Sequence, residues 1–416
     1  MRNKIFNLPV IVHKAFAILA VALFATACND DILDKEPLDA ISETNVFTDP
    51  VFLQGYVYNA HNGIRPPWNP GTGGYIGMTD IAVAAPDTHP NAAGIREYLS
   101  GNMTSDNVSD ITTDNVTGTP GFWSYQYDYI KRINAFFEGI EGSDLSPEDL
   151  NPLRGQMHFI RAWIYFDLSR HFGGVPLITT TFQLDDESFD VTRSTYDETA
   201  QFILSECDMA IGLLEGVTPA PGKITKEAAM ALKARMLLYM ASPLNNPSND
   251  PSKWLAAEAA TKAVIDAGFT LHPTHEDLFL EPLKTDEIIF GRTFTATSRI
   301  PDWGYNYDYW PSGFDARQEV VPTQTFVNMF EMTNGEYPYL EDGTTVNPAS
   351  GYDPQNPNLD RDPRYYSYIL YPGAGPVTIS DGAKSTTRLY EYWEDANPNP
   401  GNEGPYENPN KIDPLN

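Results

Sequence analysis

Cysteine is nearly absent from this sequence of 416 residues, which contains only Cys28 and Cys207. A framework of several disulfides is therefore excluded, and an exported chain of this kind depends on its hydrophobic core. The length allows one large domain or two ordinary ones. Long apolar runs are missing too. Only residues 15–25 are continuously apolar, and this run is shorter than the ~20 residues that a transmembrane helix needs.

Basic residues are scarce. The chain has 27 Lys and Arg against 56 Asp and Glu, which gives a formal net charge of -29 at pH 7. Binding to the phosphate backbone requires a patch of basic side chains, so no nucleic acid is expected as a partner. Strongly anionic polysaccharides are disfavoured for the same reason, unless a local basic pocket binds them. The acidity is otherwise explained by solubility outside the cell.

The N-terminal segment is organised like an export signal. Basic residues precede the apolar residues 15–25, and Ala25-Thr26-Ala27 leads to Cys28. This order resembles a bacterial lipoprotein signal, in which residues 1–27 are removed and the thiol of Cys28 takes a diacylglycerol. Such an N-terminal lipid would hold the protein on a membrane, because each buried CH₂ contributes about 0.8 kcal/mol. Alanine at position 25, where leucine is usual, leaves ordinary A-x-A cleavage and a secreted protein as the alternative.

Apolar residues recur every three or four positions in several segments separated by loops rich in Gly, Pro and Asn. The pattern predicts helices over residues 50–64, 123–137, 153–172, 196–214, 226–242 and 252–267. The expected N-caps are Asp49, Thr195, Thr225 and Ser252, and Glu198 completes a capping box with Thr195. Cys207 falls on the apolar face of its helix, which predicts a buried and unreactive thiol.

The short connections between these helices predict antiparallel hairpins stacked in the manner of tetratricopeptide repeats. Alanine-rich faces in the last two helices allow the close approach that such stacking needs. Later in the chain, residues 287–290 are expected to form a short strand and residues 322–332 a short helix. Loops are expected from about residue 338 onward, and residues 396–416 contain no core element. The sequence therefore predicts a mostly α-helical protein with tetratricopeptide-like hairpins, a loop-rich face and few short strands.

Several blocks of the sequence resemble one family when they are taken in order. Residues 32–38 read ILDKEPL, residues 154–168 read RGQMHFIRAWIYFDL, and residues 172–177 read FGGVPL. Residues 225–243 run from TKEAA to ASP, and shorter matches follow at residues 323–324 and 361–364 (RDPR). In this order, behind a lipoprotein leader, the blocks resemble the SusD/RagB family of outer-membrane nutrient-binding lipoproteins of Bacteroidetes.

The resemblance implies a SusD-like helical region over residues 28–270 and a partial, loop-rich C-terminal region over residues 271–416. It implies a non-catalytic, lipid-anchored protein on the cell surface of the outer membrane. Such a protein captures oligosaccharides or peptides and delivers them to a SusC-like TonB-dependent transporter. Family members continue past the RDPR block into further helices, so the sequence is expected to lack that C-terminal part. Arg161, Asp167 and Arg235 fall in helical blocks, where paired structural roles are expected rather than catalysis.

The sharpest candidate for ligand binding is an aromatic run that belongs to no family block. It comprises Trp303, Tyr305, Tyr307, Tyr309 and Trp310. In an extended chain the first four rings share one face, with Asn306 and Asp308 on the other. Flat aromatic faces suit the C–H faces of sugars, and nearby amide and carboxylate groups suit hydroxyls. The alternative is that these rings pack beneath a loop and form part of the core.

A second candidate is the loop around Trp68 and Asn69, with Tyr75 a few residues later. Prolines and glycines hold this loop, so it could present the indole of Trp68 to solvent. The alternative interpretation is a surface loop with one anchoring tryptophan. Neither candidate maps onto a family motif, and both are physical hypotheses about glycan contact.

Signatures of enzymes, cofactors and metals are weak. Residues 71–77 lack a glycine that G-x-G-x-x-G requires, and His275-Glu276 is followed by Phe279 where a zinc motif needs histidine. The oxygen-rich loops 245–250 and 353–362 could bind Ca²⁺, but turn formation explains them more simply. We therefore expect no cofactor, no metal and no enzymatic activity. A secreted or lipid-anchored glycoside hydrolase and a helical-repeat scaffold for protein partners are the alternatives.

Overall fold

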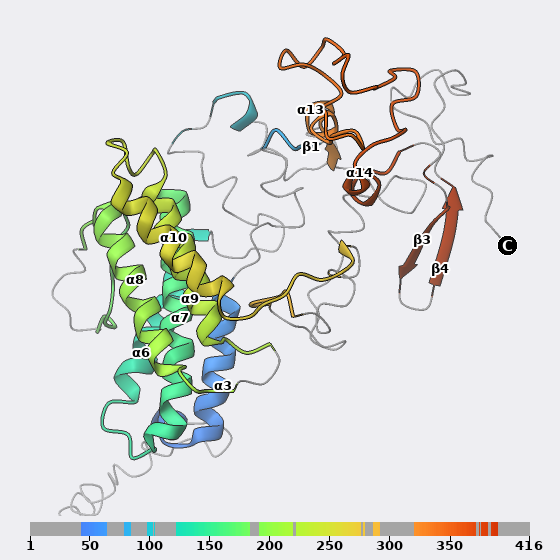
Figure 1. The fold of residues 1–416 in the computed structure, drawn as a ribbon. Helices are drawn as coiled ribbons and strands as arrows, with labels where there is room; N and C mark the ends of the chain where they lie inside the picture. The colour runs from blue at the N-terminus through green and yellow to red at the C-terminus, as the bar shows by residue number, and fades with distance from the viewer. Residues whose placement is uncertain are drawn as a thin grey trace, which may run out of the picture.

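The computed structural model describes residues 43–64, 79–84, 98–102, 104, 122–183, 191–218, 222–275, 278, 286–291, 320–371, 374, 376–381 and 384–389. A stack of long helices occupies one side of the molecule, and short helices and strands from residues 320–389 lie on the other (Figure 1). The mostly helical fold predicted from the sequence is confirmed, as are the few short strands.

The first helices begin where the sequence places its caps. Helix α2 covers Glu43–Thr48, and α3 covers Pro50–Ala60 and continues into the single 3₁₀ turn η2, His61–Gly63. The carboxylate of Asp49 accepts hydrogen bonds from the backbone N–H groups of Val51 and Phe52, which are otherwise without helical partners. Leu53 and Val57, one turn apart, are buried as the helical spacing predicted.

The long helices α6, Phe122–Gly139, and α7, Pro147–Phe172, form the centre of the stack. Ser146 caps α7, and Gly173 ends it with a φ of 71°, a left-handed conformation that favours glycine. Helix α8, Tyr196–Leu213, begins with the predicted capping box of Thr195 and Glu198. Helix α9, Lys226–Ala241, begins at Thr225, also as predicted.

Helices α7, α8, α9 and α10, Pro251–Ile265, each pack on the next one along the chain. Figure 1 shows them side by side with their axes roughly aligned. The connections from α8 to α9, residues 214–225, and from α9 to α10, residues 242–250, are short, as in helical hairpins, whereas the longer segment 173–195 joins α7 to α8. The expected stack of helical hairpins is therefore confirmed.

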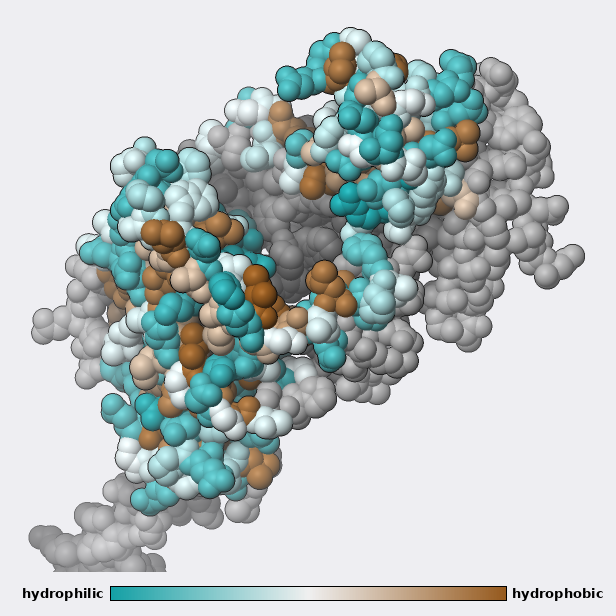
Figure 2. Space-filling view, viewed as in Figure 1, coloured by the Kyte–Doolittle hydropathy of each residue, from teal (hydrophilic) through white to brown (hydrophobic). Residues whose placement is uncertain are grey.

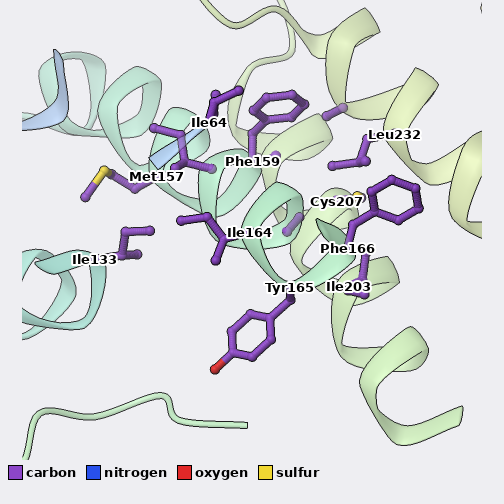
Figure 3. Packing of buried hydrophobic residues seen from close by; sticks show 14 of the residues in the cluster. Ile64, Ile133, Met157, Phe159, Ile164, Tyr165, Phe166, Ile203, Cys207 and Leu232 are labelled. Atoms are coloured by element: carbon purple, nitrogen blue, oxygen red, sulfur yellow. The ribbon is translucent and has the colours of Figure 1, made fainter. Parts of the chain in front are cut away.

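Helix α7 supplies more residues of the buried hydrophobic cluster than any other described helix. Its side chains lie between residues of α6, α8 and α9 (Figure 3). Fully buried members of this cluster are Ile133, Met157, Phe159, Ile160, Ile164, Tyr165, Phe166, Ile203 and Cys207. Burying a large aliphatic or aromatic side chain contributes about 1.5–3 kcal/mol, so this cluster is the main source of the fold's stability. The prediction of a buried Cys207 is confirmed, and burial raises the pKa of its thiol.

Residues 176–180, an irregular segment after α7, are held against the helices by hydrogen bonds with polar side chains of α6 and α7. The amide of Asn134 donates to the carbonyl oxygens of Ile178 and Thr180, at 3.0 and 3.2 Å. The hydroxyl of Tyr165 accepts from the backbone N–H of Ile178 at 2.8 Å. Tyr127 donates to the carbonyl of Pro176. These bonds satisfy backbone groups that have no partner in a helix or sheet.

Two small antiparallel sheets and two short helices make up the rest of the described fold. Strand β1, Ala82–Ala84, pairs with β2, Val320–Pro322, and β3, Pro376–Asp381, pairs with β4, Lys384–Leu389. Helix α13 covers Gln324–Asn328, and α14 covers Pro363–Tyr368. We refer to residues 320–371 as the loop lobe, since turns and loops make up most of this segment. Across the described ranges, no helix has both the length and the apolarity needed to cross a membrane.

Four local predictions are wrong. Loops were expected from about residue 338 onward, but α14, β3 and β4 lie in that segment. Residues 287–290 form no strand; the ring of Phe290 instead packs edge-on against Phe159 of α7, at a centroid distance of 5.3 Å. The helix expected over residues 322–332 is only Gln324–Asn328, because Pro322 lies in β2. The cap of α10 is Asp250, not Ser252, because Pro251 takes the first helical position and needs no hydrogen-bond acceptor.

Candidate functional site

The aromatic residues predicted to bind ligand lie outside the described residues. These are Trp303, Tyr305, Tyr307, Tyr309, Trp310, Trp68, Asn69 and Tyr75; Cys28, the expected site of lipid attachment, lies outside them too. Their predicted roles stay predictions.

The charged residues of α7 that could be mistaken for catalytic groups belong to a buried network. The guanidinium of Arg161 donates to both carboxylate oxygens of Glu206 on α8, at 2.7 and 2.9 Å, and to the side-chain oxygen of Asn134 at 3.1 Å. His158 lies 3.0 Å from the same carboxylate. The ring of Phe137 covers the guanidinium at 4.5 Å. All the polar groups of this network are less than a tenth exposed, so they join three helices rather than face a ligand.

The electrostatics of this network favour the charged form of Glu206. Burial by itself opposes ionisation of the carboxyl, but the hydrogen bonds from His158 and Arg161 outweigh it and lower its pKa. Asp167, six residues beyond Arg161 on α7, accepts a hydrogen bond from Gln126 and pairs with Arg170. The predicted structural role of Arg161 and Asp167 is confirmed.

Arg235 does not follow the same rule, although it received the same prediction. Its side chain is exposed on α9 instead of being buried with a partner. An exposed guanidinium keeps its hydration and needs no counter-charge, so its place in a helical block did not by itself determine its environment.

A pocket of about 380 Å³ lies between α3, the start of α7 and the segment after α8. Its floor is apolar and includes Leu153, Leu214 and Ile224. Tyr58 is the only aromatic residue among the described residues that line the pocket, and the ammonium of Lys223 lies 3.0 Å from the centroid of its ring. This ring face already carries a cation, so the pocket does not offer the open platform expected for a sugar.

The loop lobe is organised around Arg361. Its side chain is 1% exposed, and its guanidinium donates to the carbonyl oxygens of Val327, Phe330 and Pro357 at 2.7, 3.0 and 3.0 Å. The ring of Tyr365 covers the same guanidinium at 4.6 Å. These contacts join chain segments about 30 residues apart, so Arg361 acts as the structural centre of a lobe that has little regular secondary structure.

Helix α14 carries exposed aromatic rings on the surface of this lobe. Tyr368 is 54% exposed and Tyr366 is 43% exposed, whereas Tyr365, which precedes both, is buried. Arg364 forms two hydrogen bonds with the carboxylate of Asp362, at 2.9 and 2.7 Å. These exposed rings were not predicted from the sequence, because the RDPR block was used only as a family match and the residues that follow it were not considered. The run YYSY that follows it was the available signal.

The oxygen-rich loops are turns, as expected. The carboxylate of Asp353 accepts from the backbone N–H of Gln355 and from the amide of Asn356. In the other loop, Asn246 accepts from the backbone N–H of Asp250. Within the part of the chain that the structure describes, no group of three or more His, Cys, Asp or Glu side chains is arranged to hold a metal ion.

Exposed apolar side chains are scattered over the helical stack. On the face seen in Figure 2 they alternate with polar residues and form no continuous apolar groove among the coloured residues. Trp254, Leu255 and Ile265 of α10 are examples, at 40%, 63% and 68% exposed. Scattered apolar residues of this kind are ordinary on protein surfaces and do not by themselves favour a scaffold for protein partners.

The fold and the loop lobe define the class of protein: a stack of helical hairpins that supports a loop-rich region. Residues 80–238 match a SusD-like family model described as "Starch-binding associating with outer membrane". Residues 286–410 match the SusD/RagB model, described as "SusD family". The chain belongs to the SusD/RagB family, a family of carbohydrate-binding proteins of the outer membrane.

Solved structures agree with this fold. A SusD-like protein from Bacteroides fragilis is 23% identical with a TM-score of 0.65, and the match covers 82% of this chain and 64% of that one. A SusD-like carbohydrate-binding protein from the same organism is 20% identical with a TM-score of 0.62, covering 79% and 61%. A SusD superfamily protein from Bacteroides vulgatus is 17% identical with a TM-score of 0.54, covering 70% and 60%. A search of curated proteins gives no match.

This chain therefore spans less than two thirds of the length of these relatives. At such identities the likeness shows the fold alone.

Proposed function

We propose that this protein is a non-catalytic glycan-binding lipoprotein of the cell surface that passes its ligand to a SusC-like TonB-dependent transporter in the outer membrane. The observation that carries the proposal is the pair of family matches, at residues 80–238 and 286–410, one of them described as starch-binding. The leader that ends at Cys28 supports the anchoring. We propose the division drawn from the sequence: leader 1–27, helical region 28–270 and loop-rich region 271–416.

The mechanism we propose is capture followed by transfer. Sugars stack on aromatic faces, with Trp303, Tyr305, Tyr307, Tyr309 and Trp310 as the main platform and Trp68, Asn69 and Tyr75 as the second. Anchoring beside a transporter raises the local ligand concentration, so transfer does not depend on diffusion from bulk solution. The chain makes and breaks no bond in this scheme. The pairing of Arg161 with Glu206 and of Asp167 with Arg170 supports it, because these charged groups are used for structure.

Affinity electrophoresis against a panel of polysaccharides, followed by calorimetry with the oligosaccharides of those retarding the protein, tests ligand capture. We expect binding to at least one neutral glycan, with no shortened products after long incubation. Release of products would favour a glycoside hydrolase, and binding to peptides alone would replace the ligand class. Unchanged affinity after Trp303→Ala and Trp310→Ala together would remove these two rings from the site.

Metabolic labelling with radioactive palmitate, in a bacterial host that processes lipoproteins, tests the anchor. The protein is expected to take up label and to fractionate with the outer membrane. The Cys28→Ala variant is expected to do neither. Label that persists in this variant would contradict attachment at Cys28, whereas an unlabelled, secreted wild type would favour A-x-A cleavage.

A further inference from the structure

We propose that the exposed surface of α14, formed by Tyr368, Arg364 and the neighbouring Tyr337, is a contact surface for a neutral oligosaccharide. This inference rests on the proposed function and assigns part of ligand binding to residues outside the predicted aromatic run. Its basis is the unusual way in which the ring of Tyr368 is held.

A tyrosine at a protein surface usually buries its ring and leaves its hydroxyl in water. Tyr368 differs in that its hydroxyl is bonded to another side chain. It lies 2.6 Å from the Nε2 atom of His275, which is itself exposed, and 54% of Tyr368 is exposed. The rings of His275 and Phe330 lie beside it, at centroid distances of 5.3 and 6.3 Å. The ring is thus fixed in orientation although much of its surface is open.

A ring fixed in this way loses little side-chain entropy when a ligand stacks on it. The C–H face of a pyranose offers a flat apolar surface of matching size, and such stacking needs no hydroxyl from the tyrosine. Since the hydroxyl of Tyr368 is already bonded to His275, the ring face is the part of this residue left for a ligand.

Groups that bind hydroxyls lie next to the ring. Arg364 precedes Tyr368 by four residues, which places the two side chains on the same face of α14. Its guanidinium is paired with Asp362 and interacts electrostatically with Tyr337, which is 51% exposed. A sugar lying on Tyr368 would therefore meet both donors and carboxylate acceptors, as adjacent ring hydroxyls require.

The charge of this surface favours a neutral sugar over an acidic one. The one guanidinium is neutralised by Asp362, and Glu331 also lies within electrostatic reach of it. An anionic sugar would have to compete with these carboxylates for Arg364, on a protein with a net charge of -29. Neutral hydroxyl groups can form hydrogen bonds with Arg364 and Asp362 without separating this ion pair.

Calorimetry on purified wild-type and variant proteins tests the inference with the neutral oligosaccharide that the wild type binds best. Tyr368→Ala is expected to weaken binding about tenfold, a typical cost for truncating a central aromatic contact. Tyr368→Phe keeps the ring and is expected to stay within about threefold of the wild type. Tyr368→Leu keeps an apolar side chain against Phe330 without a flat face, so it should weaken binding even if the alanine variant folds poorly.

Tyr58→Ala in α3 is the matched control, since Tyr58 is an exposed tyrosine of the helical stack at 38%. It should bind like the wild type. If the wild type binds and both Tyr368→Ala and Tyr368→Leu bind equally well with unchanged circular dichroism, this inference is wrong and the proposed function stands. If the wild type binds no glycan of the panel, the proposed function fails, and the inference fails with it.

Discussion

Replacing Glu206 with Gln is expected to lower the free energy of unfolding by about 3 kcal/mol, although the two side chains have nearly the same shape. The change removes the negative charge that both N–H groups of Arg161 contact, at 2.7 and 2.9 Å. It creates no cavity, so the loss measures the cost of leaving a buried guanidinium without its counter-charge. Arg161 is 7% exposed and cannot regain hydration without opening the helices.

The magnitude follows from the way Arg161 is enclosed. Its other contacts include Asn134, a neutral acceptor, and the rings of Phe137 and Phe202. Breaking a buried pair by removing one partner costs about 3–5 kcal/mol. Glutamine keeps one acceptor oxygen, which places the expected loss at the lower end of that range.

Guanidinium denaturation followed by far-UV circular dichroism is the assay, in a double-mutant cycle. Arg161→Met alone should also cost about 3 kcal/mol, because it strands the buried carboxylate of Glu206. The double variant should lose about 3 kcal/mol in total, not the sum, which corresponds to a coupling energy of about 3 kcal/mol. The double variant still loses partners for His158 and Asn134, and a buried polar group without a partner costs about 1–3 kcal/mol.

The exposed pair of Lys262 and Asp266 on α10 is the matched control. Its atoms lie 2.7 Å apart, as close as those of the buried pair, but the two side chains are 68% and 58% exposed. Lys262→Gln should therefore change the free energy of unfolding by at most about 0.5 kcal/mol. Strictly additive losses in the buried cycle, or equal losses at the two sites, would refute the reasoning.

The same pair predicts the direction of an acid dependence. The pKa of Glu206 is below its usual 4.5 in the folded protein, so its charge contributes stability above the unfolded pKa. That contribution is lost as the pH falls through the folded pKa. Below about pH 4.5, the free energy of unfolding of the wild type should fall more steeply than that of Glu206→Gln. Parallel curves for the two proteins would contradict this.

Three further predictions concern single positions. Gly174→Ala should destabilise the protein by more than about 1 kcal/mol, because a Cβ atom there would lie 2.1 Å from the carbonyl oxygen of Ser194. Gly212→Ala in α8 is the control: its Cβ atom would meet no atom within 4 Å, so this change should stabilise the protein by about 0.5–1 kcal/mol. Equal melting curves for the two variants would contradict both expectations. Thr195→Ala should cost about 1 kcal/mol by chemical denaturation, and Thr195→Ser should restore most of it. Cys207, in a Cys28→Ser background at pH 8, should react with a maleimide only after unfolding, since its thiol is buried and its pKa raised; rapid labelling of the folded protein would contradict this.

Helix ends were predicted correctly from the sequence where they depend on residues that are close together in the chain. The start of α3 at Asp49, the capping box at Thr195 and the end of α7 at Gly173 are decided within one helical turn. The missed start of α10 was available from the same reasoning. Asp250-Pro251 repeats the Asp-Pro pair of α3, and Asp362-Pro363 begins the missed helix α14 in the same way.

Contacts between distant segments set the limit of prediction. Residues 287–290 have the composition of a strand, but a strand forms only where another strand pairs with it. The ring of Phe290 instead packs against an aromatic ring of α7. Arg161 and Arg235 received the same prediction because both lie in helical blocks that resemble the family. The packing of α8 on α7 buries Arg161 against Glu206, whereas Arg235 on α9 is exposed.

The two buried arginines explain why charged family-like blocks need not be binding sites. Arg161 joins three helices through a carboxylate and an amide, and Arg361 joins residues 327–330 to its own segment, 357–361, through backbone carbonyls. Each uses several donors of one planar group at once, which a lysine could not reproduce. The fold uses the donors of such residues for internal contacts, so these side chains are not available to bind a ligand. Differences in ligand between proteins of this fold are therefore expected in side chains that packing does not require, such as the open ring of Tyr368.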